Sequence, residues 1–245
     1  MELLKFRLSG KTAFFKNPEV NSYLYFSYGN IHKIAVLGIL GAILGLKGYN
    51  QQEDRDIYPE FYEKLKEIQI SIVPINNKGS FNKKIQNFNN SVGYASQEEG
   101  GNLIVTEEWL ENVIWDIYIK LDNNPIVNLL KERFLKKQFK YTIYLGKNDH
   151  LANVTDVQIL NGELIKEDVD EIISLFVKSH AKKSENTTPW NLSEKEIFRY
   201  QEKLPYKLDK ISNQYVTEDF VFTNEGVSIL TDTFVKINRG IIELF

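Results

Sequence analysis

The chain has 245 residues, of which 42% are hydrophobic and 13% aromatic; this is enough apolar surface for a folded core and excludes disorder throughout. It has no cysteine and three histidines, so disulfides and thiolate metal sites are excluded, and we expect neither a metal nor a cofactor. A net charge of −3 argues against a uniformly basic nucleic-acid binder.

Two features of the sequence predict a soluble, cytoplasmic protein. The N-terminus opens directly into a strand-like pattern rather than into a signal peptide. The longest apolar run, residues 34–46, is shorter than the roughly 20 residues that span a bilayer. We therefore expect no membrane contact.

The first strand is indicated by an alternation close to the N-terminus. Leu4, Phe6 and Leu8 alternate with the basic residues Lys5 and Arg7. A period of two is typical of a strand with one buried face. We expect a half-buried strand to open the fold.

Two helices and a second strand are predicted next. The apolar run at residues 34–46 is typical of a buried helix, which we expect to end at Gly48. Residues 58–65 favour a short amphipathic helix, and residues 68–75 favour a strand.

Residues 76–104 interrupt this regular pattern. The segment is rich in Asn and Gly and carries Phe81, Phe88 and Tyr94 at intervals. It is longer than an ordinary connection, and such excursions from compact domains are usually functional or disordered. The spaced aromatic residues favour a projecting β-hairpin over a disordered tether.

The second half of the domain repeats the pattern of strand and helix. Residues 114–121 alternate as a strand, and residues 126–137 have the apolar spacing of an amphipathic helix. Residues 141–145 and 154–160 are predicted as two further strands. The order β-α-β-β-α-β predicts an α+β, ferredoxin-like or RRM-like domain over residues 1–160.

Residues 161–245 are predicted to form a C-terminal, β-rich extension. A helix is expected over residues 166–178, followed by a hydrophilic linker over residues 179–189. Three short strands are then expected to form a small sheet, at residues 215–222, 227–230 and 241–245.

Basic residues are concentrated in three segments. Residues 1–50 hold six basic and two acidic residues, residues 74–97 hold three basic and none acidic, and residues 125–150 hold six basic and two acidic. If the segments converge on folding, they would form one groove for a phosphate backbone. Charge alone favours the simpler alternative, in which each segment is an ordinary solvated surface.

No enzymatic motif is present, but one set of residues has the chemistry for RNA cleavage without metal. Such cleavage needs a general base, a general acid and a cation. Tyr28, His32 and Lys33 supply these groups within six positions, and Lys147 with His150 offers a second set. A histidine beside a lysine in a loop is more often structural or RNA-binding. A metal-independent endoribonuclease that processes precursor guide RNA is therefore the alternative function.

Three blocks of sequence resemble the Cas-five family of Cascade subunits. Residues 4–49 are similar to the family's first strand, aromatic loop and glycine-rich helix, the last seen here as GILGAILG at residues 38–45. Residues 144–152, YLGKNDHLA, are similar to the glycine turn after the family's fourth strand. Residues 88–105 are similar to the type I-B branch. Residues 26–33 depart from the family, because many members have a proline-rich approach to the helix.

The resemblance implies a RAMP protein that works in an antiviral CRISPR interference complex rather than a free-standing enzyme. It implies binding and capping of the 5′ handle of the guide RNA, a thumb-like hairpin at residues 76–104 over a kink in that RNA, and contacts with the backbone subunit and the large subunit. Target DNA would be met only indirectly. The residues that we expect to contact RNA are Lys11, Tyr28, His32, Lys33, Lys83, Lys84, Phe88, Asn89, Tyr94, Lys147 and His150.

Overall fold

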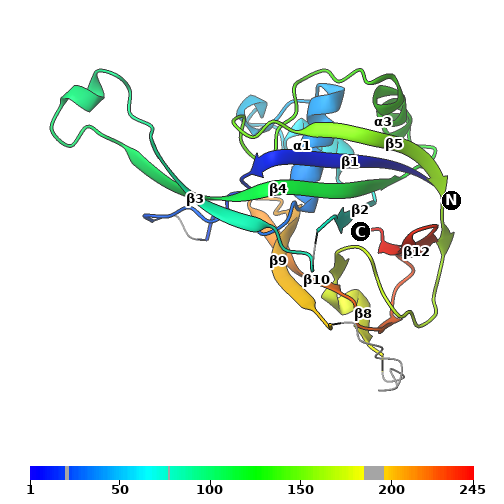
Figure 1. The fold of residues 1–245 in the computed structure, drawn as a ribbon. Helices are drawn as coiled ribbons and strands as arrows, with labels where there is room; N and C mark the ends of the chain where they lie inside the picture. The colour runs from blue at the N-terminus through cyan, green and yellow to red at the C-terminus, as the bar shows by residue number, and fades with distance from the viewer. Residues whose placement is uncertain (20–21, 77, 185–195) are drawn as a thin grey trace.

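Antiparallel sheets and three α-helices make up the computed structural model, which describes residues 1–19, 22–76, 78–184 and 196–245 (Figure 1). The helices are α1 (Lys33–Leu44), α2 (Glu60–Leu65) and α3 (Pro125–Lys136). The strands of the main sheet are β1 (Glu2–Ala13), β2 (Ile70–Pro74), β3 (Asn82–Asn89), β4 (Ile104–Lys120) and β5 (Asn153–Asn161). Single 3-10 turns lie at Tyr49–Gln51, Ala95–Gln97 and Lys178–His180.

The C-terminal part consists of short strands. They are β6 (Glu163–Leu164), β7 (Phe176–Val177), β8 (Ala181–Lys183), β9 (Arg199–Leu208), β10 (Tyr215–Thr223), β11 (Val227–Ile229), β12 (Phe234–Ile237) and β13 (Gly240–Glu243). The structure pairs them as β7-β10-β9, β11-β8 and β13-β12-β6. Strands β10, β11 and β13 confirm the expected strands near residues 215–222, 227–230 and 241–245, whereas β9 and β12 were not predicted. The expectation that the three form one small sheet is wrong, because each pairs with different partners in a separate sheet.

The main sheet has the strand order β2-β4-β1-β5, with β3 paired to the outer part of β4. On one face, Leu4, Phe6 and Leu8 are fully buried against α1 and α3, and the rings of Phe6 and Phe134 stack with centroids 4.4 Å apart. On the other face, β12 and β13 cover the sheet through a second apolar cluster (Figure 1). Both faces of the sheet centre are therefore covered by protein.

The covered second face also buries a cluster of charges. Asp116 is fully buried and accepts hydrogen bonds from Arg7 Nε at 2.8 Å and Arg239 Nη1 at 2.6 Å, while Lys5 Nζ lies 3.3 Å away. Lys5 also bonds Asp156. Burial alone would raise the pKa of Asp116, but the hydrogen bond from Arg7 and the nearby cations hold that pKa below its usual range.

Two specific residues define the beginning and the end of helix α1. His32 precedes the helix, and its Nδ1 accepts a hydrogen bond from the Ala35 amide at 3.3 Å. The helix stops at Gly45, whose φ of 81° is left-handed and is adopted at low cost only by glycine. The expected end at Gly48 is wrong by three residues, because the left-handed turn occurs earlier.

A long hairpin projects from the body; we call β3, residues 90–103 and the outer part of β4 the arm (Figure 1). Strand β4 continues from the arm into the centre of the main sheet, so the expected strand at residues 114–121 is only its inner half. At the junction, Asn112 has a φ of 51°. This left-handed residue, a conformation that asparagine tolerates better than most, marks where the arm leaves the body.

The expected strand at residues 141–145 is wrong, since only an isolated bridge joins Tyr144 to Leu151. The amides of Lys140 and Tyr141 instead donate to the carbonyls of Ile43 and Ala42 at the end of α1. Carbonyls in the last turn of a helix lack the usual partner four residues on, although the Gly45 amide also donates to Ala42 at 3.3 Å. The bonds from Lys140 and Tyr141 hold the segment beside the end of α1, away from the sheet. The glycine turn at residues 144–152 precedes β5, as expected, but no strand of the main sheet leads directly into it.

The expected helix at residues 166–178 is also wrong. Its amides bond to distant strands instead: Val169 donates to Val227, Ile173 to Ile241 and Leu175 to Ile72. These bonds hold the segment extended along the C-terminal strands and β2. Of the expected linker at residues 179–189, residues 181–183 form β8, and residues 185–189 lie outside the described residues. Within the described ranges, no helix is long and apolar enough to cross a membrane.

His180 makes the stability of the C-terminal part dependent on pH. Its Nδ1 bonds the fully buried carboxylate of Glu243, which also accepts the Val177 amide at 2.6 Å; the hydrogen bond to Glu243 raises the pKa of His180 above its ordinary 6.5. A histidine whose pKa is higher in the folded than in the unfolded protein stabilises the folded state. This stabilisation is complete below the unfolded pKa and disappears as pH rises through the folded pKa.

We therefore expect the stabilisation by His180, measured as the free energy of unfolding of the wild type minus that of His180→Gln, to shrink as pH rises above about 6. His32 and His150 have lowered pKa values and change the stability of both proteins alike in the opposite direction, so the difference isolates His180. Urea unfolding of both proteins at a series of pH values measures it, and a difference that stays constant with pH would contradict the assignment.

Candidate functional site

The root of the arm is fastened to the body by Lys147. Its Nζ donates to both carboxylate oxygens of Glu107, at 2.9 and 3.1 Å, and Glu107 is 5% exposed. The same ammonium group lies over the ring of Phe88, 5.1 Å from its centroid, and over Phe14 at 5.6 Å. Lys147 therefore links the turn before β5 to both strands of the arm.

Aromatic packing reinforces this root. The Trp109 indole donates to Glu107 Oε2 at 2.8 Å, and its ring meets the His150 ring edge-on at 4.6 Å. Nδ1 of His150 lies 2.7 Å from the Thr12 hydroxyl, while Nε2 is buried without a hydrogen-bond partner in the described part of the chain. Burial lowers the pKa of His150, with a further contribution from Lys147.

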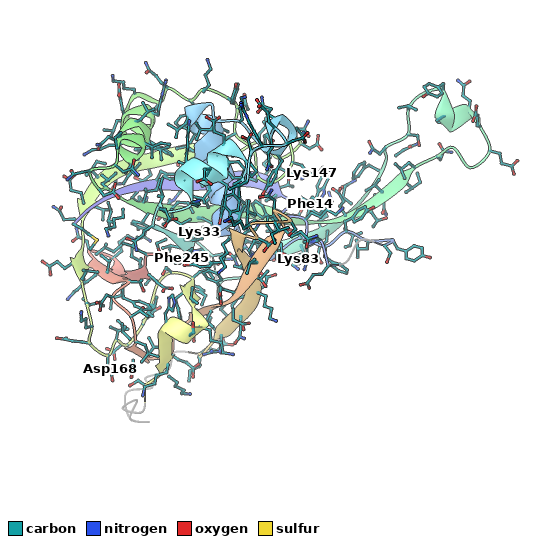
Figure 2. All side chains as sticks on the ribbon, turned by 180° about the vertical axis from the view of Figure 1, so that it is seen from behind. Phe14, Lys33, Lys83, Lys147, Asp168 and Phe245 are labelled. Atoms are coloured by element: carbon teal, nitrogen blue, oxygen red, sulfur yellow. The ribbon has the colours of Figure 1, made fainter. Side chains whose placement is uncertain are left out.

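Lysines from two of the basic segments thus lie near one another, although charge alone had favoured separate solvated surfaces. Figure 2 shows Phe14, Lys83 and Lys147 close together where the arm joins the body, with Asp168 at the far end. However, Lys147 is already paired with Glu107, so its charge is largely neutralised within the chain. Its main role in this structure is to position the arm.

A groove of about 900 Å³ runs along α1 beside the root of the arm. Its floor is formed by the helix, with Ala35, Gly38 and Ala42 among the residues exposed to it. Its walls come from three separate segments, residues 14–16, 46–51 and 141–147, and from Tyr215 of β10. The lining includes the aromatic residues Phe14, Phe15, Tyr49, Phe61, Tyr141, Tyr144 and Tyr215.

The structure places the expected catalytic residues in the interior. Tyr28 and His32 are each 3% exposed and His150 is 1% exposed. The His32 ring packs edge-on against Phe15, Tyr28 and Tyr215, at 5.9, 5.4 and 5.3 Å. Burial lowers the pKa of His32 to about 3 and raises that of Tyr28 well above its usual range. A neutral histidine and a neutral phenol at this depth do not suit proton transfer to RNA.

Lys33 is buried as well. It is the first residue of α1, is 8% exposed, and has its Nζ over the Tyr206 ring at 5.0 Å. Burial lowers the pKa of Lys33 to about 8, with Glu67 opposing the shift. The expectation that Tyr28, His32, Lys33 and His150 lie at an accessible surface is therefore corrected. Aromatic rings enclose the first three beside the start of α1, and Trp109 encloses His150 at the root of the arm.

The remaining expected residues are accessible. Lys11 is exposed, although it lies within β1 and not in a loop. On the arm, Lys84 is exposed, while Lys83 is exposed but paired with Glu108 at 2.8 Å. Phe88 is half-buried at the root.

Two expected residues lie further out along the arm, towards its tip. Tyr94 is 78% exposed. Asn89 is exposed at the end of β3 and accepts the Ser91 amide at 2.8 Å.

The net charge of the arm differs from that of the basic segment at residues 74–97, because the arm also includes the outer part of β4. Residues 82–111 contain two lysines but five glutamates, Glu98, Glu99, Glu107, Glu108 and Glu111. Because β3 pairs with β4 over Glu107, Glu108 and Glu111, the local positive charge of residues 74–97 is offset by acids from the partner strand. The arm as a whole is therefore not a cationic surface.

Sequence reasoning missed the residues that join distant segments. Lys16, Tyr49 and Tyr215 line the groove, and Glu107 with Trp109 holds the root of the arm. None of them belongs to a local motif. The one usable signal is the density of tyrosine and phenylalanine next to α1. Within the described ranges, no group of three or more His, Asp or Glu side chains could hold a metal ion.

Comparisons with known proteins point in one direction. Residues 3–209 match the sequence model of a family described as CRISPR-associated protein (Cas_Cas5). No curated protein matches the sequence at a significant level. Among solved structures, a chain of a "CRISPR RNA-guided surveillance complex" is similar with a TM-score of 0.53 at 10% identity, covering 91% of this chain and 90% of that one. A CRISPR protein from Archaeoglobus fulgidus is similar with a TM-score of 0.52 at 9% identity, covering 99% of this chain and 98% of that one.

Proposed function

Because the chain belongs to the CRISPR-associated protein family (Cas_Cas5), we propose that it is the guide-RNA-binding subunit of a CRISPR surveillance complex. It would bind and cap the 5′ handle of the guide RNA with the arm as a thumb. The observation that carries this proposal is the arm itself, a long hairpin fixed at its root by Lys147 and carrying exposed Lys84, Asn89 and Tyr94.

The arm suits contact with the bases of a bent RNA more than contact with an extended sugar-phosphate backbone. Its mixed charge leaves few cations for phosphates, so exposed aromatic and amide groups would make the contacts beyond the root. A base that stacks on an aromatic ring such as Tyr94 gains about 1–3 kcal/mol. Lys11, Lys83 and Lys84 would neutralise phosphates nearer the body, and Phe88 would support the root.

The fold and partners of the proposed subunit follow from the same family. The strand order β2-β4-β1-β5 supports a ferredoxin-like domain over residues 1–160, with residues 161–245 as an extension that covers one sheet face. The extension, which carries the acidic residues Glu163, Glu167, Asp168, Asp170 and Glu171, would then face the backbone and large subunits of the complex. The similarity of residues 88–105 to the type I-B branch supports that subtype.

We propose a binding role rather than a catalytic one. Support comes from the burial of Tyr28, His32 and His150, which leaves no accessible acid–base pair at the candidate site within the described ranges. The complex would thus receive guide RNA cut by another enzyme.

RNA binding should depend on salt and on the arm. We expect single-stranded RNA to bind the full chain, and the Lys83→Ala/Lys84→Ala variant to bind more weakly, with a salt slope smaller by about 0.7 for each phosphate that the variant no longer neutralises. Fluorescence polarisation between about 50 and 200 mM salt measures both quantities.

The matched control is Lys131→Ala/Lys136→Ala on α3, at the other end of the body from the arm (Figure 1). These lysines also pair with acids, Glu2 and Glu132, and their loss should leave RNA affinity unchanged. The proposal is wrong if the chain binds no RNA, or if both double variants behave alike. Specific cleavage of repeat RNA in EDTA by the purified chain would establish the catalytic alternative instead.

A further inference from the structure

A second pocket lies next to the turn between β9 and β10, and its volume is about 470 Å³. Glu19, Tyr49 and Gln214 line it and are exposed, so they form its rim. Tyr28, which is 3% exposed, and the half-buried Tyr215 lie deeper in the same lining. The pocket is therefore open to solvent at the rim and aromatic inside.

The inner aromatic walls are electrically neutral. Tyr28 and Tyr215 pack edge-on against His32, at centroid distances of 5.4 and 5.3 Å. Burial lowers the pKa of His32 to about 3, so at neutral pH this histidine adds no positive charge behind the pocket. Burial, followed by the charge of Glu19, raises the pKa of Tyr28, so its phenol is not ionised.

The polar groups of the lining are acceptors. Glu19 supplies a negative charge, and in the described part of the chain no lysine or arginine lines the pocket. Asn213 also belongs to the lining, and its Oδ1 is buried without a hydrogen-bond partner among the described residues. A buried acceptor without a donor is costly. Since no bond holds this amide oxygen, it can turn towards a donor that enters the pocket.

Aromatic faces, a carboxylate and an unpaired amide oxygen together select a flat cation with several N–H donors. A cation is attracted to the face of an aromatic ring within about 6 Å. A guanidinium group also stacks on such rings, and its five donors can serve a carboxylate and an amide oxygen at once. An RNA phosphate would instead meet the negative charge of Glu19. The pocket therefore suits a guanidinium group and not the RNA backbone.

The turn beside the pocket indicates that a protein supplies this cation. Ile211 is 93% exposed and lies on the turn that provides Asn213 and Gln214 to the lining. The turn is ordered, because Asp209 Oδ1 accepts the amides of Ile211 and Ser212 at 3.0 and 2.8 Å. An apolar side chain held in solvent next to a polar pocket suits a protein interface, in which arginine is a frequent anchor.

We propose that this pocket binds the guanidinium group of an arginine side chain from a partner protein. The guanidinium group lies against Tyr49 and Tyr215 and donates to Glu19 and Asn213, while Ile211 contacts an apolar side chain next to the arginine. The site needs no RNA, so this inference stands or falls independently of the proposed function.

The test compares two capped tripeptides that differ in one charge. The probes are acetyl-Leu-Arg-Leu-amide and the same peptide with citrulline, which has the size of arginine without its charge. Each is titrated into the ¹⁵N-labelled full chain, and the amide NMR signals of Asn213, Gln214 and Tyr215 report binding. The arginine peptide should bind with a Kd of about 1 mM, and the citrulline peptide about 10-fold more weakly.

Two variants of the rim test the contacts. Glu19→Gln keeps the size of the side chain and should weaken binding of the arginine peptide about 2- to 5-fold. Tyr49→Leu removes one aromatic face and should weaken it about 2- to 30-fold. The matched control is Glu98→Gln/Tyr94→Leu, which changes an exposed acid and an exposed tyrosine on the arm and should bind the peptide as the wild type does.

Several results would overturn the proposal. These are absence of binding, equal binding of the arginine and citrulline peptides, and a loss of affinity in the control variant as large as in Glu19→Gln. Butylguanidine that binds as tightly as the arginine peptide would identify a small free cation, without contact to Ile211, as the occupant. Single-stranded RNA that displaces the peptide and shifts the same amide signals would assign the pocket to RNA; the pocket proposal would then be wrong while the proposed function stands.

Discussion

Replacing Asp116 by alanine is expected to lower the free energy of unfolding by about 3–5 kcal/mol. The carboxylate is fully buried and is shared by Lys5, Arg7 and Arg239. Its removal leaves Lys5, which is 3% exposed, inside the protein with one remaining acid at the edge of the cluster. An uncompensated buried charge costs far more than the loss of an exposed ion pair.

Urea unfolding at neutral pH measures this loss for Asp116→Ala. The matched control is Asp156→Asn, which removes the charge of a partly exposed partner of Lys5, keeps Asp116 and tolerates the left-handed φ of 51° at this position, and it should cost much less than Asp116→Ala. Equal losses in the two variants would show that burial of Asp116 is not what makes the cluster important. The cluster joins β1 and β4 to Arg239, so the loss should appear in the unfolding of the whole chain.

The same substitution at two glycines of α1 is expected to have opposite effects. Gly41→Ala places a Cβ 2.6 Å from Cβ of Phe61, so α1 and α2 must move apart, at a cost of about 1–3 kcal/mol. Gly38→Ala enters open space and removes the flexibility of glycine from the helix, so it should stabilise by about 0.5–1 kcal/mol.

Thermal or urea unfolding of the two variants side by side tests this contrast, and each serves as the other's control. A similar loss of stability in both variants would show that a methyl group at Gly38 also disturbs the packing of α1, which contradicts the prediction. A stable Gly38→Ala protein would also show that the groove can be altered without damage to the fold.

Local periodicity predicted the elements of the main domain well. Strand β1 followed from the alternation of Leu4, Phe6 and Leu8, and α3 from its apolar spacing, because neighbouring residues alone decide these patterns. The boundaries were harder. The end of α1 depends on which glycine adopts the left-handed conformation, and the sequence offers both Gly45 and Gly48.

The predictions from sequence were wrong where groups far apart in the chain determine the local structure. Residues 141–145 look like a strand, but the carbonyls at the end of α1 take the amides of Lys140 and Tyr141. His32 and His150 look like exposed loop residues, yet aromatic side chains from elsewhere enclose them. The groove depends on the same effect, since Tyr49 and Tyr215 are far apart in the chain and no local pattern joins them.

The torsion at Asn112 has a mechanical consequence for the arm. A single continuous strand, β4, provides both the arm and the centre of the main sheet, so the arm has no separate hinge segment. A load on the tip reaches the pairing of β4 with β1 through the backbone of β4, and reaches the turn before β5 through Lys147. The angle of the thumb is thus coupled to the interior of the protein, and whatever bends the tip also strains the sheet.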